Sequence, residues 1–428
     1  MSIRSAMSAG MTGLHAHSTS ITVTGDNVAN INTVGYRGSR AIFEDLLTRK
    51  ITGIGQLTGT RLATIDKIFR QAAITPSSRA TDMAINGRGF FCLKGNHDGL
   101  DGSFYSRAGA FNVDNEGYLV NPQGLNLQGY MADTDGNIAT NLSDIKLGPE
   151  DLPPAATSEI NVSTNLDATE QTVVAAFDPA DPQATSNYST SITVMDSVGN
   201  QHEVTMYFRK SGTNTWEWHA LTEGAEVAGG VPGVPEEIGT GSLVFTADGL
   251  LDQENITLNS VDFVGAAAGQ TISYDFGESI TTDGGDGLSA TTAFAAPSVV
   301  KMISQNGFSA GELVDVAVDG GGAIMGVYSN GQRRTLAQVA VADFLNQQGL
   351  ERIGGTLFID TIDTGEALIG LARTGGRGGI RGQSLEQSNV DLAEEFVSLI
   401  SAQRGYQASG KTITTADELF VETINLKR

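Results

Sequence analysis

IRSAMSAGMTGLHAHSTSITVTGDNVANI, residues 3–31, carries an apolar side chain at every seventh position, at Met7, Leu14, Ile21 and Val28. A repeat of seven keeps one stripe of a helix turned toward a partner helix and predicts a left-handed supercoil. The segment has no acidic or basic residue between Arg4 and Asp26. A helix without charges on any face is expected to bury most of its circumference against neighbours. This pattern favours an assembly subunit over an enzyme.

The C-terminal end repeats the same signal, which predicts that the two terminal helices pair in a coiled-coil-like manner. Its helix is expected to begin near Ser388 and Asn389, with Asn389 as the cap and Asp391 in the first turn. Small residues such as Gly10, Ser18 and Gly25 follow a second seam of the first helix and would permit close approach. The predicted assembly interface comprises Met7, Leu14, Ile21, Val28, Leu392, Phe396, Leu399, Tyr406, Ile413 and Phe420.

Two groups of residues are expected to end a helix or to form a hinge. Asn30, Asn32 and Gly35 follow the first helix, where Asn and Gly accept the left-handed conformation. The run 375–382 resembles a phosphate-binding loop but lacks the Lys-Ser/Thr pair, so a flexible hinge is favoured. Its predicted hinge residues are Gly375, Gly376, Gly378 and Gly379.

The charge is distributed unevenly along the 428 residues, whose formal net charge is −23. Residues 148–300 hold 22 acidic and two basic residues, which we interpret as a domain with a solvated acidic exterior. Nucleic acid is disfavoured as a partner because phosphate binding needs a basic surface. No run of eighteen apolar residues occurs, so no membrane insertion is expected. The N-terminal segment does not have the pattern of a cleaved secretory signal.

Between its ends the chain has the pattern of antiparallel β-structure. Residues 36–78 are expected to form a short amphipathic helix followed by extended chain. Alternating apolar residues and Gly/Asn turns predict strands beyond them. The predicted strands are at 83–87, 90–93, 104–107, 110–113, 118–120, 125–130, 191–195, 202–208, 216–219, 313–318, 323–328 and 338–342.

The predicted fold class is multidomain α+β, mainly β, with paired N- and C-terminal helices and nested antiparallel β domains. One domain inserted in another keeps each domain's entry and exit points close together. The expected division is a terminal helical assembly domain (1–35 and 383–428), a linker region (36–78 and 370–382), an inner β domain (79–147 and 301–369) and an outer acidic β domain (148–300).

No set of reactive residues points to catalysis, and no cofactor or metal is expected. The five histidines lie in none of the metal-binding or hydrolase motifs. They are His15, His17, His97, His202 and His219. The single cysteine, Cys92, lies within an apolar run and is expected to be buried and inert.

The same residues resemble a known family, the bacterial flagellar rod and hook proteins. Both ends carry this resemblance, and so do two motifs of the inner β region. At the ends the motifs are Ser8-Ala9-Gly10-Met11-Thr12-Gly13-Leu14, the run from Val23 to Tyr36, Leu385-Glu386-Gln387-Ser388-Asn389-Val390-Asp391-Leu392 and Gln403-Arg404-Gly405-Tyr406. The inner motifs are the run from Asp82 to Phe91 and Ser106-Arg107-Ala108-Gly109-Ala110-Phe111. Gly405 departs from the family's usual Ala and is expected to loosen the helix locally.

The resemblance implies an axial protein of the flagellum, located outside the cell and exported by the flagellar type III apparatus without a cleaved signal. A chain of this length with a central β insertion is similar to the hook members, which form a curved tube that acts as a universal joint. The implied partners are further copies of the chain, rod and hook–filament junction proteins, the hook cap and the export apparatus. Two alternatives stay open at this point: a distal rod subunit, and a secreted β-rich adhesin.

Overall fold

The computed structural model describes residues 3–47, 57–133, 136–148 and 151–425. The chain divides into two compact units. We call the first the terminal unit; it comprises Met1–Glu150, Val314–Val327 and Arg333–Arg428. We call the second the inserted unit; it comprises Asp151–Leu313 and Tyr328–Gln332. The inserted unit therefore interrupts the terminal unit in sequence, as a nested arrangement requires.

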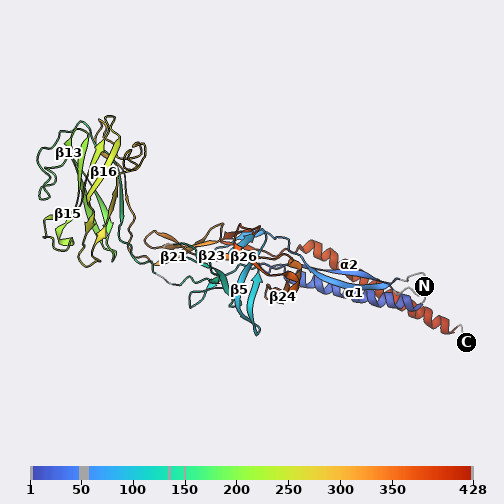
Figure 1. Cartoon of the computed structure of the whole chain (residues 1–428). Helices are drawn as coiled ribbons and strands as arrows, with labels where there is room; N and C mark the ends of the chain where they lie inside the picture. Colours follow the sequence, from blue (N-terminus) through green and yellow to red (C-terminus); the bar gives the residue numbers. More distant parts are fainter. Residues whose placement is uncertain (1–2, 48–56, 134–135, 149–150, 426–428) are drawn as a thin grey trace. The chain divides into compact units, whose positions relative to one another are not determined.

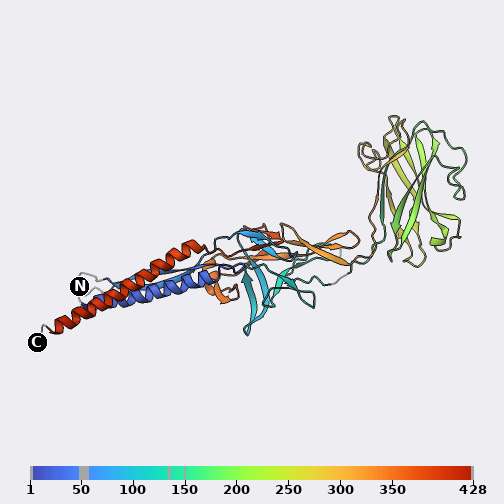
Figure 2. The same ribbon diagram turned by 180° about the vertical axis from the view of Figure 1, so that it is seen from behind.

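Two long helices of the terminal unit lie side by side, as both Figure 1 and Figure 2 show. They are α1 (Ile3–Ala29) and α2 (Leu392–Asn425), so the first ends two residues earlier than predicted. The prediction that Asn389 caps the second helix was wrong. Asp391 is the cap, because its Oδ1 accepts hydrogen bonds from the backbone N–H groups of Ala393 (2.8 Å) and Glu394 (3.2 Å). A carboxylate here satisfies N–H groups that have no partner in the helix.

After α1 the described residues form two paired strands, and the short amphipathic helix predicted within residues 36–78 was wrong for the part of this segment that the structure describes. Strand β1 (Ser39–Leu47) pairs antiparallel with β2 (Leu57–Lys67). The hairpin also packs along α1, where the N–H of Thr60 donates to the side-chain oxygen of Thr12 over 3.3 Å. Strand preference depends on what a segment packs against. For β1 the packing surface is supplied by α1 and by β2, and the sequence pattern of β1 alone does not reveal either partner.

The largest sheet of the terminal unit holds twelve strands built from both halves of its sequence. Its central path runs β21 (Leu313–Val318), β22 (Ala323–Tyr328), β23 (Arg333–Asp343), β9 (Asn126–Met131), β5 (Phe90–His97), β6 (Leu100–Ser106), β25 (Leu357–Ile359) and β24 (Glu351–Gly354). Strands β7 (Asn112–Val113), β8 (Leu119–Val120), β10 (Ser143–Asp144) and β26 (Leu368–Leu371) attach to this path. Two smaller pairs join β4 (Met83–Asn86) to β27 (Gly379–Gly382) and β3 (Ile74–Pro76) to β28 (Ser384–Glu386).

This sheet buries apolar side chains on both faces. Along β5, Phe91 and Leu93 belong to one hydrophobic cluster, and Phe90 and Cys92 belong to another. The alternation follows from the two-residue period of a strand. Cys92 is a buried free thiol, as predicted, and burial raises its pKa to about 12. Most strands predicted for this region are present, but the strand predicted at 110–113 is confined to Asn112–Val113. Gly331 of the predicted turn has a φ of +81°.

The inserted unit packs a five-stranded antiparallel meander against a three-stranded sheet. The meander runs β12 (Tyr188–Met195), β13 (Gln201–Gly212), β14 (Thr215–Glu223), β15 (Pro235–Phe245) and β16 (Leu251–Leu258). The smaller sheet runs β19 (Ser273–Asp275), β11 (Glu159–Asn165) and β20 (Val299–Gln305). Strands β17 (Ser260–Val261) and β18 (Gln270–Thr271) form a separate pair. Three 3-10 turns complete the described elements of the chain: η1 (Gly224–Glu226) here, and η2 (Gln347–Gly349) and η3 (Ile362–Thr364) in the terminal unit.

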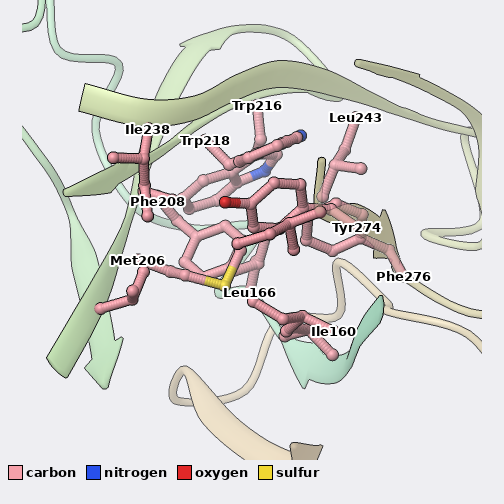
Figure 3. Packing of buried hydrophobic residues seen from close by; sticks show 14 of the residues in the cluster. Ile160, Leu166, Met206, Phe208, Trp216, Trp218, Ile238, Leu243, Tyr274 and Phe276 are labelled. Carbon is pink, nitrogen blue, oxygen red and sulfur yellow. The ribbon is translucent and has the colours of Figure 1, made fainter. Parts of the chain in front are cut away.

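The core of the inserted unit gathers aromatic side chains from the two sheets. Figure 3 shows Trp218 of β14 beside Tyr274 and Phe276, with ring centroids 4.6 and 5.2 Å from its own. Phe208 of β13 and Ile160 of β11 belong to the same cluster. The Trp-Glu-Trp alternation of β14 thus places both tryptophans on the inward face.

One predicted boundary needs correction. The predicted inner β domain includes residues 301–369, but β20 pairs with β11 inside the inserted unit. Residues 301–313 therefore belong to the inserted unit. Strand pairing decides this boundary, because β11 lies more than a hundred residues earlier and no local pattern links the two strands. The rest of the four-part division stays a prediction.

The pH dependence of the inserted unit's stability follows from Glu254 on β16. Burial, together with the nearby Asp283 and Asp275, raises its pKa from 4.5 to about 7. The folded state therefore keeps a proton that the unfolded chain releases, and the free energy of unfolding falls as pH rises between these values. Glu254→Gln should unfold at a higher temperature than the wild type at pH 8 and with little difference at pH 4. Thermal melts of monomeric protein followed by tryptophan fluorescence test this, and a constant difference across the pH range would contradict it.

Candidate assembly interface

The two terminal helices run antiparallel and touch along their whole shared length. The contacts pair low residue numbers on α1 with high ones on α2. From one end of the pair to the other, the contacting residues are Gly10 with Ile413, Gly13 with Ser409, His17 with Gly405, and Asn27 with Glu395.

Glycines set the closeness of this pair. A Cβ atom on Gly10 would lie 2.6 Å from Cγ1 of Ile413, and one on Gly405 would lie 2.4 Å from the ring of His17. Both distances are below van der Waals contact, so a larger residue would push the helices apart. Gly405 provides the space for the imidazole of His17, and the predicted loosening of α2 at this residue stays a prediction.

The predicted stripe of α1 is only half-buried. Met7, Leu14, Ile21 and Val28 all have intermediate exposure. The fully buried side chains of the described part of α1 are smaller or polar, namely Ala16, Val23, Thr24 and Asn27. The hairpin β1–β2 explains the difference, because it covers a second side of the helix. The uncharged circumference of α1 thus has two neighbours within its own chain.

The predicted stripe of α2 divides into covered and uncovered positions. Leu399 and Ile413 are half-buried, whereas Leu392, Phe396, Tyr406 and Phe420 are exposed. The side chains that α2 buries completely are Ala402 and Ala416. Further large apolar residues are exposed on this helix, namely Val397, Ile400, Leu419, Val421 and Ile424. Small residues therefore face α1, and many of the large ones are left uncovered.

Two asparagines join the helix pair to the chain beside it. The side-chain N–H groups of Asn27 donate to the carbonyl of Ser39 (2.7 Å) and to Glu395 (2.8 Å), and its oxygen accepts from the N–H of Ser39 (2.9 Å). Asn389 accepts from the N–H of Gly38 (2.7 Å) and donates to the carbonyl of Ile68 (2.6 Å). Asn389 therefore ties both ends of the β1–β2 hairpin to the start of α2. Sequence reasoning gave it a capping role and missed this one.

A buried carboxylate lies where the terminal segments meet the β-structure. Glu386 is completely buried, with Oε1 2.7 Å from Nη2 of Arg37 and Oε2 3.2 Å from Nη1 of Arg107. Its Oε1 also accepts a hydrogen bond from the N–H of Ala72 (3.0 Å). Arg107 donates further to the carbonyls of Ile85 (3.2 Å) and Gly87. Burial, with Arg37 beside it, lowers the pKa of Arg107 to about 10.

Close backbone approach explains the glycines around this ion pair. Gly35 has a φ of +70°, and its N–H donates to the carbonyl of Glu386 over 2.8 Å. A Cβ on Gly35 would lie 2.3 Å from the nitrogen of Ala108, and one on Gly109 would lie 1.7 Å from the carbonyl oxygen of Met83. The motifs that carry the family resemblance at 35, 82–87, 106–111 and 385–389 therefore meet in one place.

The predicted helix-end residues behave differently from one another. Asn30 ends α1, since its side-chain amide donates to the carbonyl of Asp26 (2.9 Å) and its Oδ1 accepts from Thr33 (3.1 Å). Gly35 takes the left-handed conformation, as expected of a residue after a helix. Asn32 is exposed, and the hydrogen bonds described here do not involve its side chain.

The predicted hinge glycines lie in a hydrogen-bonded turn between β26 and β27. Gly375 and Gly376 have φ values of +56° and +83°. Gly378 packs against the backbone of Asn86 and Gly87 and donates to the carbonyl of Arg88 over 2.7 Å. Close packing accounts for Gly378, and turn geometry accounts for the other two. Gly379 begins β27. A hinge role for the four stays a prediction.

Among the described residues, no group of three or more His, Cys, Asp and Glu side chains is arranged to hold a metal ion. No helix within the described ranges is long and apolar enough to cross a membrane. The histidines of the inserted unit pair with carboxylates: His202 contacts Glu226 (2.8 Å) and Asp196 (3.3 Å), and His219 contacts Glu237 at 2.5 Å.

Two glycines of α1 should respond in opposite ways to alanine. Gly25 has open space around its Cβ position, so Gly25→Ala should stabilise the helix by about 0.5–1 kcal/mol. Gly10→Ala gains the same propensity but meets Ile413 and the backbone of Ser409. We expect it to be destabilising. Chemical denaturation followed by circular dichroism measures both, and equal effects would contradict the described helix contact.

The buried carboxylate should be indispensable to the terminal unit. Glu386→Gln leaves Arg37 and Arg107 buried without a counter-charge, a loss of about 3–5 kcal/mol for a pair of this kind. Glu394→Gln, at an exposed position in the first turn of α2, is the matched control and should change stability far less. Urea unfolding measures the free energy of unfolding of both variants. Equal values would contradict the structural role of the Glu386 ion pair.

Models of flagellar proteins match four segments that together span most of the chain. Residues 84–173 match a model described as Flagellar hook protein FlgE/F/G D1 domain, and 165–308 match one described as Flagellar basal body protein FlaE D2 domain. The ends match models described as Flagella basal body rod protein (residues 7–37) and Flagellar basal body rod FlgEFG protein C-terminal (residues 381–426).

Whole-chain relatives carry the name Flagellar hook protein FlgE. The protein of Borreliella burgdorferi is 35% identical, with 98% of each chain covered. That of Escherichia coli K12 is 32% identical over 99% of this chain and 100% of its own. The crystal structure of Helicobacter pylori flagellar hook protein FlgE2 covers 73% of this chain and 100% of its own, with a TM-score of 0.52 and 17% identity, which supports the fold. The chain therefore belongs to the family of bacterial flagellar hook proteins.

Proposed function

We propose that many copies of this chain polymerise helically into the flagellar hook, a curved tube that transmits motor torque to the filament as a universal joint. The observation that carries the proposal is the uncovered apolar surface of α2. An aliphatic and aromatic surface of this extent is costly to leave in water, and patches of this kind mark protein interaction sites. Further copies of the chain are the partner that a family of hook proteins implies.

The family is structural, and its members are not enzymes. They are components of the hook of the external flagellum. The alternatives of a distal rod subunit and an adhesin are not favoured, because hook proteins match the chain from end to end. Contacts that do not close on themselves generate a helical polymer rather than a ring.

The division of labour along the chain is part of the proposal. The helical segments 1–35 and 383–428 assemble and line a central channel, and the acidic β domain faces solvent. Sliding between neighbouring β domains gives the bending, while the helical tube carries torque. The network of Glu386 supports this assignment, because it holds the helical segments firmly to the β-structure within one copy.

The specific partners are also proposals. Rod proteins at one end, junction proteins at the other, and the cap and export apparatus during growth follow from membership of the hook family.

Removal of residues 1–30 and 390–428 should abolish polymerisation and leave soluble monomers. The reason is that the truncation deletes the surface on which copies associate. Sedimentation and electron microscopy distinguish tubes from monomers. Large polymers of the truncated chain would refute the proposal.

Point changes on α2 separate assembly from folding. Val397→Glu and Ile400→Glu alter exposed side chains, so the monomer should stay folded while assembly weakens. Val174→Glu in the inserted unit, where Val174 is 93% exposed, is the control that should assemble normally.

A further inference from the structure

A pocket of about 500 Å³ opens in the terminal unit at the end of α1. Its apolar lining includes Val34, Ala110 and Phe358, and the turn Gly354–Thr356 between β24 and β25 forms part of its wall. Arg352 also lines it. The guanidinium of Arg352 lies 4.7 Å from the ring centre of Tyr36 and donates to the carbonyl of Arg37, so it is held in place.

The β24–β25 hairpin carries two exposed apolar side chains at its other end, where β24 begins and β25 ends. We call these residues, Leu345 and Ile362, the knob. Leu345 is 90% exposed and Ile362 is fully exposed, the most uncovered apolar side chains of the described terminal unit. The knob is rigid, because the side chain of Asn346 donates to the carbonyl of Asp363 over 3.0 Å and η2 packs against η3. Two bare aliphatic side chains on a fixed turn are suited to entering a partner's cavity.

The charges of the knob and the pocket are complementary. The segment 360–366 presents three exposed acids around Ile362, namely Asp360, Asp363 and Glu366. In the pocket, Arg352 makes no ion pair with a carboxylate of the described residues, whereas the charge of Arg37 is balanced by Glu386. Asp26 is the one acid of the lining. The acids around Ile362 are therefore complementary in charge to Arg352, the cation of the lining that has no ion pair among the described residues.

We propose that the knob at Ile362 of one copy enters the pocket at Arg352 of the next copy. This inference rests on the proposed function and adds to it a second contact, separate from the helices. Knob and pocket are different surfaces at opposite ends of one hairpin, so the contact can join copies head to tail. It leaves a free knob and a free pocket at the two ends of a row, which is how a head-to-tail contact propagates.

Crosslinking between differently marked copies tests the contact directly. Full-length chains with Ile362→Cys are mixed with chains with Ala110→Cys, polymerised, and treated with a short bismaleimide. Covalent dimers should form in the mixed polymer, and not in mixed monomers or in polymers of either variant alone. Val174→Cys replaces Ile362→Cys as the control and should give none. Normal polymers without mixed dimers would overturn the inference.

Assembly measurements give an independent readout. Ile362→Glu should raise the critical concentration for polymerisation by about tenfold, because it replaces an aliphatic side chain that the contact between copies would bury. Ile362→Leu should leave it nearly unchanged. At the exposed rim, Gln123→Glu should weaken assembly and Gln123→Lys should not. If none of these changes alters the critical concentration while Ile400→Glu raises it, the inference fails and the proposed function stands. If wild-type chains never polymerise, both fail.

Discussion

The buried pairing of Glu386 with Arg37 and Arg107 is the constraint on which the terminal unit depends. It joins three segments from distant parts of the sequence, and each brings a charge that burial would make costly alone. The backbone around it has been fitted closely, with Gly35 and Gly109 at positions where a Cβ would strike a neighbouring chain segment. Separate hydrogen bonds of Asn27 and Asn389 join the two helices to the β1–β2 hairpin.

The helix pair is organised in the reverse of an ordinary coiled coil. Its interior seam is made of small residues, such as Gly10, Gly405 and Ala402, and many of its large side chains face outward. Because the residues of this seam are small, the backbones of the two helices lie close together. The outward side chains of α2 are then available to other copies. This arrangement is physically sensible for a subunit whose hydrophobic surface is completed by its neighbours.

Much of the architecture could be predicted from local pattern. Three strands of the meander (β12, β13 and β14), several strands of the largest sheet and the existence of both helices followed from periods of two and seven residues, and the burial of Cys92 followed from its apolar run; β11, β15, β16 and β20 were not predicted. The failures share a cause in packing that the local pattern does not reveal. The role of Asn389 and the placing of residues 301–313 depended on partners far away in sequence, and β1 depended on packing against α1 and β2. The predicted stripes identified the correct helices, but a seven-residue spacing cannot tell which neighbour covers which side.

The sequence by itself determined the nested order of the chain, its mainly β fold with helical ends, and the family that its end motifs resemble. It could do so because periodicity and turn chemistry are local properties. Only the tertiary structure decided which face of α2 stays bare, that Gly405 makes room for His17, and that Glu386 bridges two arginines. These are decided by contacts between segments hundreds of residues apart, whose energies depend on distance and burial and leave no periodic trace in the chain.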